Sequence, residues 1–500
     1  DYSSPVSSFT YIASRHPGDD EVCLVLCDTF TICDTLFYTM RVTNETLSLP
    51  FMDDFSYRGP YPAASHWLDE APFVNNNLAV EPPSVGVATF DGLDRSGTPY
   101  GGNFGEADRL TSKHIDLSGV SGELVLTYWL QPSGLGNKPE PRDSMVLEFK
   151  NNQGAWVSMR RFEGVPNNQP STVIEPFRFY AQPVGQNFRH GQFQFRFKNH
   201  SERTGLLDVW HLDYVRLDRN ETDTTISDIA FTNDPLPILS PYSSMPWRHF
   251  KGNETGQLSE TISARLYNHA EQTLNADPSS VRVRETNTNI ELYNVTLFNG
   301  QEANIPNQQN LFRQYSLIDD NTGFPPVWTD YLQILQGPAF DDVERPEFVT
   351  TYRLSNASQI SDPGFEAVQR NDTVRQVTVF DNYFAYDDGT AEAGLVAGQG
   401  NEVAVRFTAT VEDSLRAIRL HIPHTSIDVS DQRFNLKVWI GELDDEPEYS
   451  QIFVRPVYFD DFFDELHGFS TYPLVNENGE LTPLYLPPGD FYLGWEQETP

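Results

Sequence analysis

Three aspartates supply the chemistry that the sequence indicates most directly. Asp53 and Asp54 lie in an apolar segment that begins at Pro50, and Asp213 lies in a second apolar segment far along the chain. First and last strands are neighbours in many β-sandwiches, which would bring these carboxylates together. Oxygen ligands from separate strands suit a structural Ca²⁺ rather than a transition metal. The alternative is that Asp213 hydrogen-bonds to the backbone and the other two aspartates face solvent.

His211 shares a predicted strand face with Asp213, so the two side chains are candidates for an acid and a base. A buried histidine held by an aspartate is more often structural than catalytic. The chain contains no Gly-x-Ser-x-Gly elbow and no His-Glu-x-x-His motif. We therefore expect a non-enzymatic chain, and a catalytic domain outside these residues stays an open alternative.

Aromatic side chains are the candidates for ligand stacking, since they make up 13% of the chain. Most should lie in the core; Trp129, for example, sits within an apolar strand. Trp156, in the segment Gly154-Ala-Trp-Val, is the ring expected at the surface, where it can stack on a ligand. The alternative is that Trp156 also belongs to the core.

The element that must position Asp213 is a predicted strand over Asp208–Leu217. Alternation puts one apolar set on one face and a second apolar set on the other, so this should be a central, covered strand. An unpaired buried carboxylate is costly, so Asp213 needs a partner. The first face comprises Trp210, Leu212 and Tyr214; the second comprises Val209, Val215 and Leu217, with His211 and Asp213.

Period-2 alternation around this strand predicts an all-β protein. Met145, Leu147 and Phe149 alternate with Val146, Glu148 and Lys150, and other short runs with this period are separated by Pro-, Gly- and Asn-rich loops. We expect four parts. They are a β-rich lead-in over 1–47, a jelly-roll sandwich over 48–218, an immunoglobulin-like sandwich over 219–380, and a third sandwich over 381–500, which we expect to be incomplete.

Charge and composition exclude some partners. The net charge of -37 argues against nucleic acid and against anionic membrane surfaces. No apolar run is long enough to span a bilayer. Residue 1 is Asp, which suggests a processed chain. Cys23, Cys27 and Cys33 are consistent with a hairpin disulfide plus one thiol, or with buried cysteines; their pairing is left open.

Four segments resemble exported multidomain proteins of the Bacteroidota that are cargo of the type IX secretion system. They are Pro50–Ser56, Pro83–Asp94, Trp210–Asp213 and Tyr386–Gly394, the last reading Tyr-Asp-Asp-Gly-Thr-Ala-Glu-Ala-Gly. The first sandwich is similar to the MAM-type or concanavalin-like jelly rolls of adhesion proteins. This resemblance implies contact with the type IX machinery during export and an extracellular or outer-surface location.

The same resemblance implies O-glycosylation, whose signal in this phylum is Asp, then Ser or Thr, then a small or apolar residue. Thr224 and Thr373 are the preferred sites among the matching triplets, because they lie near predicted domain edges.

Together these observations predict an adhesion or recognition protein for a glycan or a surface protein. In this prediction the jelly roll binds and the later sandwiches act as spacers. Two alternatives stay open: a carbohydrate-binding accessory region of a larger secreted enzyme, and a structural component of the export or gliding machinery.

Overall fold

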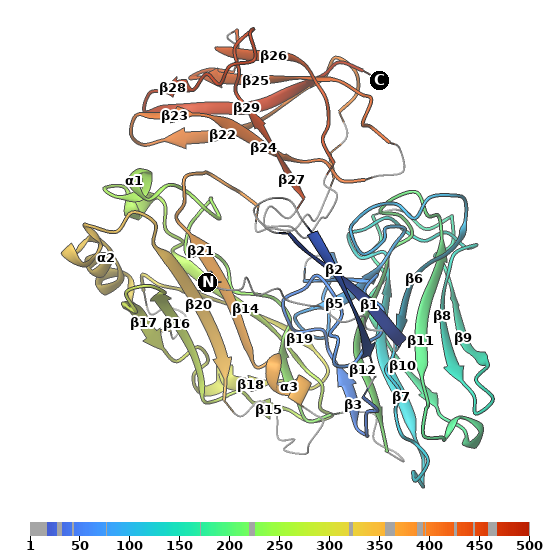
Figure 1. The fold of residues 1–500 in the computed structure, drawn as a ribbon. Coiled ribbons are helices and arrows are strands. Elements are labelled where there is room, and N and C mark those ends of the chain that lie inside the picture. Colours follow the sequence, from blue (N-terminus) through green and yellow to red (C-terminus); the bar gives the residue numbers. More distant parts are fainter. Residues whose placement is uncertain are drawn as a thin grey trace, which may run out of the picture.

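The computed structural model confirms an all-β protein, with 42% strand and 7% helix. It describes residues 18–27, 33–42, 45–76, 78–170, 172–219, 226–319, 324–355, 366–387, 394–395, 397–424, 428–443, 446–458 and 468–499. Antiparallel sheets form successive sandwiches along the chain (Figure 1). Within these ranges no helix has the length and apolar character needed to cross a membrane.

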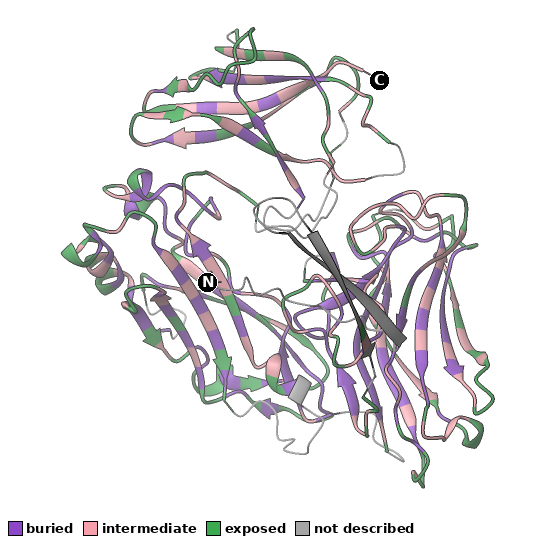
Figure 2. Ribbon diagram, viewed as in Figure 1, coloured by how far each residue is buried: buried purple, intermediate pink, exposed green. Residues whose placement is uncertain are grey.

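The first sandwich packs a six-stranded sheet against a four-stranded one. The larger sheet has β10 (Arg178–Pro183), β7 (Val125–Pro132), β12 (Trp210–Asp218), β5 (Val87–Phe90) and β4 (Phe73–Asn75) in that order, with β3 (Phe51–Asp53) also paired to β12. The smaller sheet has β6 (Gly105–Thr111), β11 (Phe195–Ser201), β8 (Ser144–Lys150) and β9 (Trp156–Glu163). The alternating apolar side chains predicted from the sequence form the core between the sheets. Figure 2 marks the buried residues along these strands in purple.

Strand β12 is central and buried on both faces, as predicted, but the predicted face assignment is wrong after Asp213. Tyr214 has a φ of 52°, and the register with β7 shifts between Asp213 and Arg216. This irregularity changes the phase of the alternation. Tyr214 therefore lies outside the core that it was expected to share with Trp210. The residues of β12 that face the sandwich core are Trp210, Leu212, Val215 and Leu217.

The second sandwich follows a short connection from β12. One sheet has β13 (Ile229–Phe231), β14 (Thr261–Asn268) and β19 (Asn310–Ser316). Another has β17 (Glu291–Val295), β16 (Ser279–Glu285), β20 (Glu347–Leu354) and β21 (Thr373–Val379), and β15 (Leu274–Asn275) pairs with β18 (Asn304–Ile305). The helices are short: α1 (Trp247–Phe250), α2 (Trp328–Gln336) and α3 (Glu366–Arg370), with 3-10 turns at Gln186–Phe188, Glu254–Gly256, Gly300–Ala303 and Pro338–Phe340.

The third sandwich has its own hydrophobic core and also packs against the second sandwich. Phe407 and Phe491 belong to the same hydrophobic cluster as the core of the second sandwich. One sheet has β22 (Glu402–Ala409), β29 (Gly489–Gln497), β25 (Phe434–Ile440) and β26 (Tyr449–Val454). The other strands form the pairs β23 (Asp413–Leu415) with β28 (Leu484–Leu486), and β24 (Ala417–His421) with β27 (Phe469–Pro473).

In the described part of the lead-in segment, β1 (Gly18–Cys27) and β2 (Cys33–Val42) pair as antiparallel strands. Cys27 and Cys33 are register partners at the end of these strands, and Cys23 is opposite Phe37. The side chains of these cysteines lie outside the described part of the structure, so their pairing stays a prediction.

Candidate functional site

The structure brings Asp53, Asp54 and Asp213 to the same region of the first sandwich. Strand β12 pairs with β3 so that Val215 is opposite Asp53. All three aspartates are fully buried, which shows that the alternative of a solvent-facing Asp53–Asp54 pair is wrong. Asp213 accepts hydrogen bonds from the Ser84 backbone N–H at 3.0 Å and from the Ser84 hydroxyl at 3.1 Å. Its requirement for a partner is therefore met within the first sandwich.

The partners of Asp53 and Asp54 come partly from the second sandwich. Arg370, at the end of α3, donates from its guanidinium to Asp53 Oδ1 at 3.1 Å. The amide of Asn371 donates to Asp54 Oδ2 at 3.0 Å and to Asp228 Oδ2 at 3.1 Å. These contacts form a polar clamp, defined as Asp53, Asp54, Asp228, Arg370 and Asn371, that joins the two sandwiches.

Burial dominates the electrostatics of the clamp. It raises the pKa of Asp54, which the Arg370 guanidinium opposes, and it raises the pKa of Asp228 to about 7. Burial also raises the pKa of Asp213 well above its usual range, and the charge of Asp54 adds to this shift. Protein donors thus contact all three predicted calcium ligands, and a calcium ion at these residues stays a prediction.

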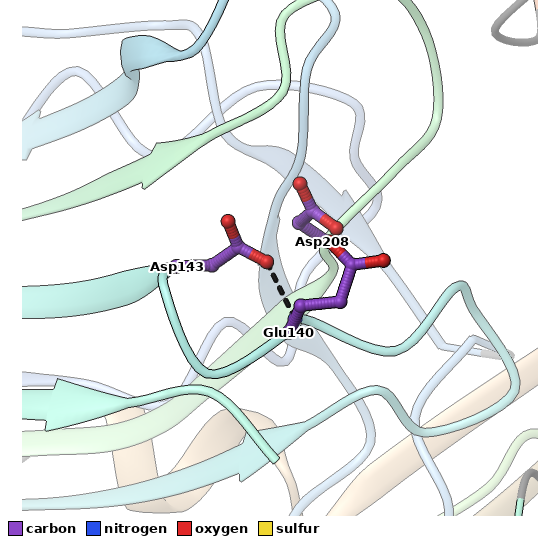
Figure 3. A group of neighbouring side chains, drawn as sticks. All are labelled: Glu140, Asp143 and Asp208. Carbon is purple, nitrogen blue, oxygen red and sulfur yellow. Dashed lines mark hydrogen bonds between the residues drawn. The ribbon is translucent and has the colours of Figure 1, made fainter. Parts of the chain in front are cut away.

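A second group of acidic side chains is more compact than Asp53, Asp54 and Asp213. One carboxylate oxygen from each of Glu140, Asp143 and Asp208 lies within 4.8 Å of the others, and these three could hold a metal ion (Figure 3). In the parts of the chain that the structure describes, this is the one such group of His, Cys, Asp and Glu side chains. The sequence analysis did not single it out, because Asp208 is far from the other two in the chain.

The junction between the first two sandwiches also contains a cavity of about 170 Å³, which we call the junction pocket. Its first-sandwich wall comes from β7, β10 and β12, and its second-sandwich wall from β14 and the residues next to it. The aromatic lining is Trp129, Phe179, Tyr214 and Tyr267; the remaining lining is Thr127, Arg216, Ile226, His269 and Gln308.

The rings of the junction pocket hold one another in place. Trp129 makes edge-to-face contacts with Phe179 at 5.4 Å and with Tyr267 at 5.7 Å between ring centroids. Tyr214 stacks on His269 at 3.9 Å and donates its hydroxyl proton to Asp228 Oδ2 at 2.7 Å. Because its φ is positive, Tyr214 turns away from the sandwich core toward this wall, and such strain in a non-glycine residue often marks a functional position.

His269 is neutral in this environment. Its Nε2 lies 2.9 Å from the Pro83 carbonyl oxygen, so we assign the proton to Nε2 as the donor. Burial lowers the pKa of His269 to about 3. The rings that line the pocket are thus all uncharged, which suits contact with an apolar face of a ligand.

The other sequence predictions fall elsewhere. Trp156 begins β9 and is partly buried; the Arg196 guanidinium lies 4.1 Å from its ring centroid, so a protein cation already occupies one position near the ring. His211 does not bond to Asp213: its Nδ1 lies 2.9 Å from the Thr89 hydroxyl and its Nε2 lies 3.1 Å from the Ser133 carbonyl oxygen. Burial lowers the pKa of His211 to about 4, in keeping with a structural histidine.

Of the two predicted glycosylation sites, Thr224 lies outside the described residues. Thr373 is the first residue of β21 and is half-buried. Neither modification is tested by the structure.

Sequence reasoning missed the junction pocket because it assigned Trp129 to the core. The signal was present, since Trp129 alternates with Leu126, Tyr128 and Leu130, which do face the core. An aromatic side chain at an outward position of a central strand implies a cover. Its partner, Tyr267, belongs to the second sandwich, so no local pattern could identify it.

Comparison with known proteins shows distant structural similarity only. No protein-family model matches the chain, and no curated protein matches it in sequence. The carbohydrate-binding module CBM27-1 of Caldicellulosiruptor saccharolyticus, solved with mannohexaose, is 14% identical, covering 35% of this chain and 98% of that one with a TM-score of 0.23. The K1 cleaved adhesin domain of Lys-gingipain from Porphyromonas gingivalis W83 is 13% identical, covering 34% and 98% with a TM-score of 0.23.

A third solved structure, a β-galactosidase described as putative from Bacteroides fragilis, is 10% identical and covers 58% of this chain and 35% of its own, with a TM-score of 0.20. At these identities and TM-scores the likenesses carry no argument about what this chain binds.

Proposed function

We propose that this chain is a non-catalytic recognition protein that binds a glycan through the junction pocket. The observation that carries the proposal is the set of four aromatic rings, Trp129, Phe179, Tyr214 and Tyr267, around one cavity. Sugar rings present flat C–H faces that stack on aromatic side chains, and nearby polar groups bind their hydroxyls. Thr127, Arg216 and Gln308 supply polar groups at the same cavity.

The size of the cavity supports a small ligand group over a protein surface. Its volume of about 170 Å³ is close to that of an apolar cavity of about 150 Å³ that holds one benzene molecule. It therefore matches one six-membered ring. Phe179 is 38% exposed, so the pocket opens to solvent and a longer glycan can continue outside it.

The proposal includes the cellular setting that the sequence motifs imply. The chain would act outside the cell or on its outer surface, after export by the type IX system. Structural Ca²⁺ would support the fold. The third sandwich, which shares a hydrophobic cluster with the second, would act as a spacer rather than as a binding unit. Detection of the protein in the medium or on intact cells, and its retention inside a strain that lacks the type IX system, would test this part.

The binding experiment begins with a glycan array probed with the full chain, followed by calorimetric titration of the strongest hit. Phe179→Ala and Trp129→Ala should each weaken binding by about tenfold, because each removes a stacking surface worth about 1.4 kcal/mol. Phe179 is the safer change for folding, since its ring is partly exposed.

Trp156→Ala is the matched control, because it removes an aromatic ring from β9, outside the lining of the junction pocket. The Trp156→Ala variant should bind the glycan with the affinity of the wild type. Affinity that depends on Trp156 and not on Phe179 would place the ligand at β9 and would refute the proposal. A failure to bind any glycan on the array would refute it as well.

A further inference from the structure

The acidic group of Glu140, Asp143 and Asp208 is built on the first sandwich, at the end of the sheets where the β7–β8 loop meets the approach to β12. Asp143 precedes β8 and its backbone N–H bonds to the Glu140 carbonyl oxygen at 2.9 Å, while the Glu140 N–H donates to Asp143 Oδ2 at 2.5 Å. Asp208 precedes β12, and its N–H donates to the Asn137 side chain at 3.0 Å. Backbone N–H groups thus hold two of the three carboxylates: the Glu140 N–H bonds to Asp143, and the Glu202 N–H bonds to Asp208 Oδ2 at 2.8 Å. Figure 3 shows the three side chains together.

One buried oxygen in this group lacks a donor. Asp143 is fully buried, and its Oδ1 accepts no hydrogen bond from any described residue. The Arg142 Nε lies 3.8 Å from that oxygen, beyond hydrogen-bond distance. Arg142 is itself more than half exposed and directs another guanidinium nitrogen to Glu202. Burying a carboxylate oxygen without a hydrogen-bond donor costs folding free energy. Asp143 Oδ1 is therefore an acceptor that a bound cation could satisfy.

The local charge is also unbalanced. Burial, and then the charge of Asp208, raises the pKa of Asp143 to about 7, and burial raises the pKa of Asp208. The carboxylates of Glu140, Asp143 and Glu202 lie within 4.0 Å of the one guanidinium of Arg142, and Asp208 adds a further carboxylate beside Glu140 and Asp143. Like charges at this spacing repel one another, and a divalent cation removes that repulsion.

We propose that Glu140, Asp143 and Asp208 bind one Ca²⁺ ion that ties the β7–β8 loop to the start of β12. The three ligands are all carboxylates, which suits a hard cation rather than zinc. Glu140 is exposed, so water can reach the ion and complete its shell. Calcium tolerates an irregular shell of six to eight oxygens, whereas magnesium requires a near-ideal octahedron. This site is separate from the junction pocket and from the clamp aspartates.

The test is calorimetric titration of the full chain with CaCl₂ after treatment with EDTA. The wild type should bind one ion at these residues with a Kd of about 10⁻⁴ M, the range of extracellular calcium modules. Asp143→Asn and Glu140→Gln should each weaken that binding by at least about tenfold. Glu140 is exposed, so Glu140→Gln decides the question even if Asp143→Asn fails to fold.

One further variant makes the assignment specific. Asp116→Asn removes an exposed carboxylate elsewhere on the first sandwich and should leave calcium binding unchanged. Wild-type binding that persists in both Asp143→Asn and Glu140→Gln would overturn the proposal, and so would the absence of binding heat at millimolar calcium.

Thermal unfolding gives a second readout. Calcium at about 2 mM should raise the Tm of the wild type and of Asp116→Asn, and should not change the Tm of Asp143→Asn. In EDTA, Asp143→Asn should melt no lower than the wild type, because it removes one of the repelling charges. If Asp143→Asn melts far below the wild type in EDTA, Glu140→Gln takes its place in this readout. A calcium-induced rise in the Tm of Glu140→Gln equal to that of the wild type would refute the proposal.

Discussion

The ring of Tyr214 in the first sandwich stacks on the imidazole of His269 in the second, with centroids 3.9 Å apart and planes 18° from parallel. Each residue is also fixed by a buried hydrogen bond, Tyr214 to Asp228 and His269 to Pro83. The stack closes one side of the junction pocket, so the geometry of the pocket depends on how the two sandwiches dock.

Replacing Arg370 should weaken that docking. Arg370→Met removes the guanidinium that contacts Asp53 at 3.1 Å and leaves buried carboxylates without their cation. Loss of one partner from a buried ion pair costs about 3–5 kcal/mol, and the partial exposure of Arg370 reduces the expected loss to about 2 kcal/mol. Urea unfolding followed by tryptophan fluorescence measures this change. Arg375→Met, at an exposed position of β21, is the control and should change stability by less than about 0.5 kcal/mol.

His269 should make the protein sensitive to acid. The pKa of His269 is about 3 in the folded chain against the usual 6.5, so the unfolded chain binds the extra proton first as the pH falls. The contribution of neutral His269 is therefore complete above pH 6.5 and decreases as the pH falls toward 3. Between pH 6.5 and 5 the loss is about 2 kcal/mol. His269→Gln keeps a donor for Pro83 and should lose less stability over that interval; parallel curves for the two proteins would contradict the prediction.

Asp228 should make the folded protein less stable as the pH rises, which is opposite to the effect of His269. Burial raises the pKa of Asp228 from the usual 3.8 to about 7 in the folded chain, so the folded chain holds the proton more tightly. Its contribution to stability therefore decreases as the pH rises from 3.8 through 7. Asp228→Asn keeps an acceptor oxygen for Tyr214 and does not titrate. Relative to wild type, the variant should gain stability as the pH rises from 5 to 8, by about 2 kcal/mol or more. A difference that does not change with pH would rule out this titration.

Gly134 should not tolerate a side chain. It has a φ of 56°, and a Cβ there would lie 2.4 Å from the Leu78 carbonyl oxygen and 2.5 Å from His211 Nε2. Gly134→Ala therefore combines backbone strain with a clash against a buried histidine, and should lower the unfolding free energy by about 3 kcal/mol. Gly154 has a φ of 81°, and a Cβ there would lie in open space. Gly154→Ala should therefore lower the unfolding free energy by only about 1 kcal/mol. Equal melting temperatures for the two variants would contradict the clash.

Strands whose apolar alternation lies within a few consecutive residues could be predicted from the sequence. Phe193, Phe195 and Phe197 alternate with polar residues, and all three are fully buried, because period-2 alternation follows directly from strand geometry. The approach of Asp53 to Asp213 was also predictable, since it needs only that the first and last strands of the sandwich be neighbours.

The structural features that the sequence did not predict depend on contacts between distant residues or on unusual backbone conformations. A left-handed conformation at Tyr214 is rare for a non-glycine residue, so nothing in the alternation signalled the change of phase in β12. The pairing of Arg370 with Asp53 joins residues 317 positions apart in the chain, and Trp129 meets Tyr267 in another sandwich. Such contacts require knowledge of how the sandwiches dock.

The junction pocket takes its walls from two sandwiches that the chain connects in series, and this has a mechanical consequence. A force that pulls the first sandwich away from the second would separate Trp129 from Tyr267. A ligand bound in the junction pocket would therefore raise the force needed to separate the two sandwiches. Because such coupling is reciprocal, tension on the chain would lower the affinity for the ligand and favour its release.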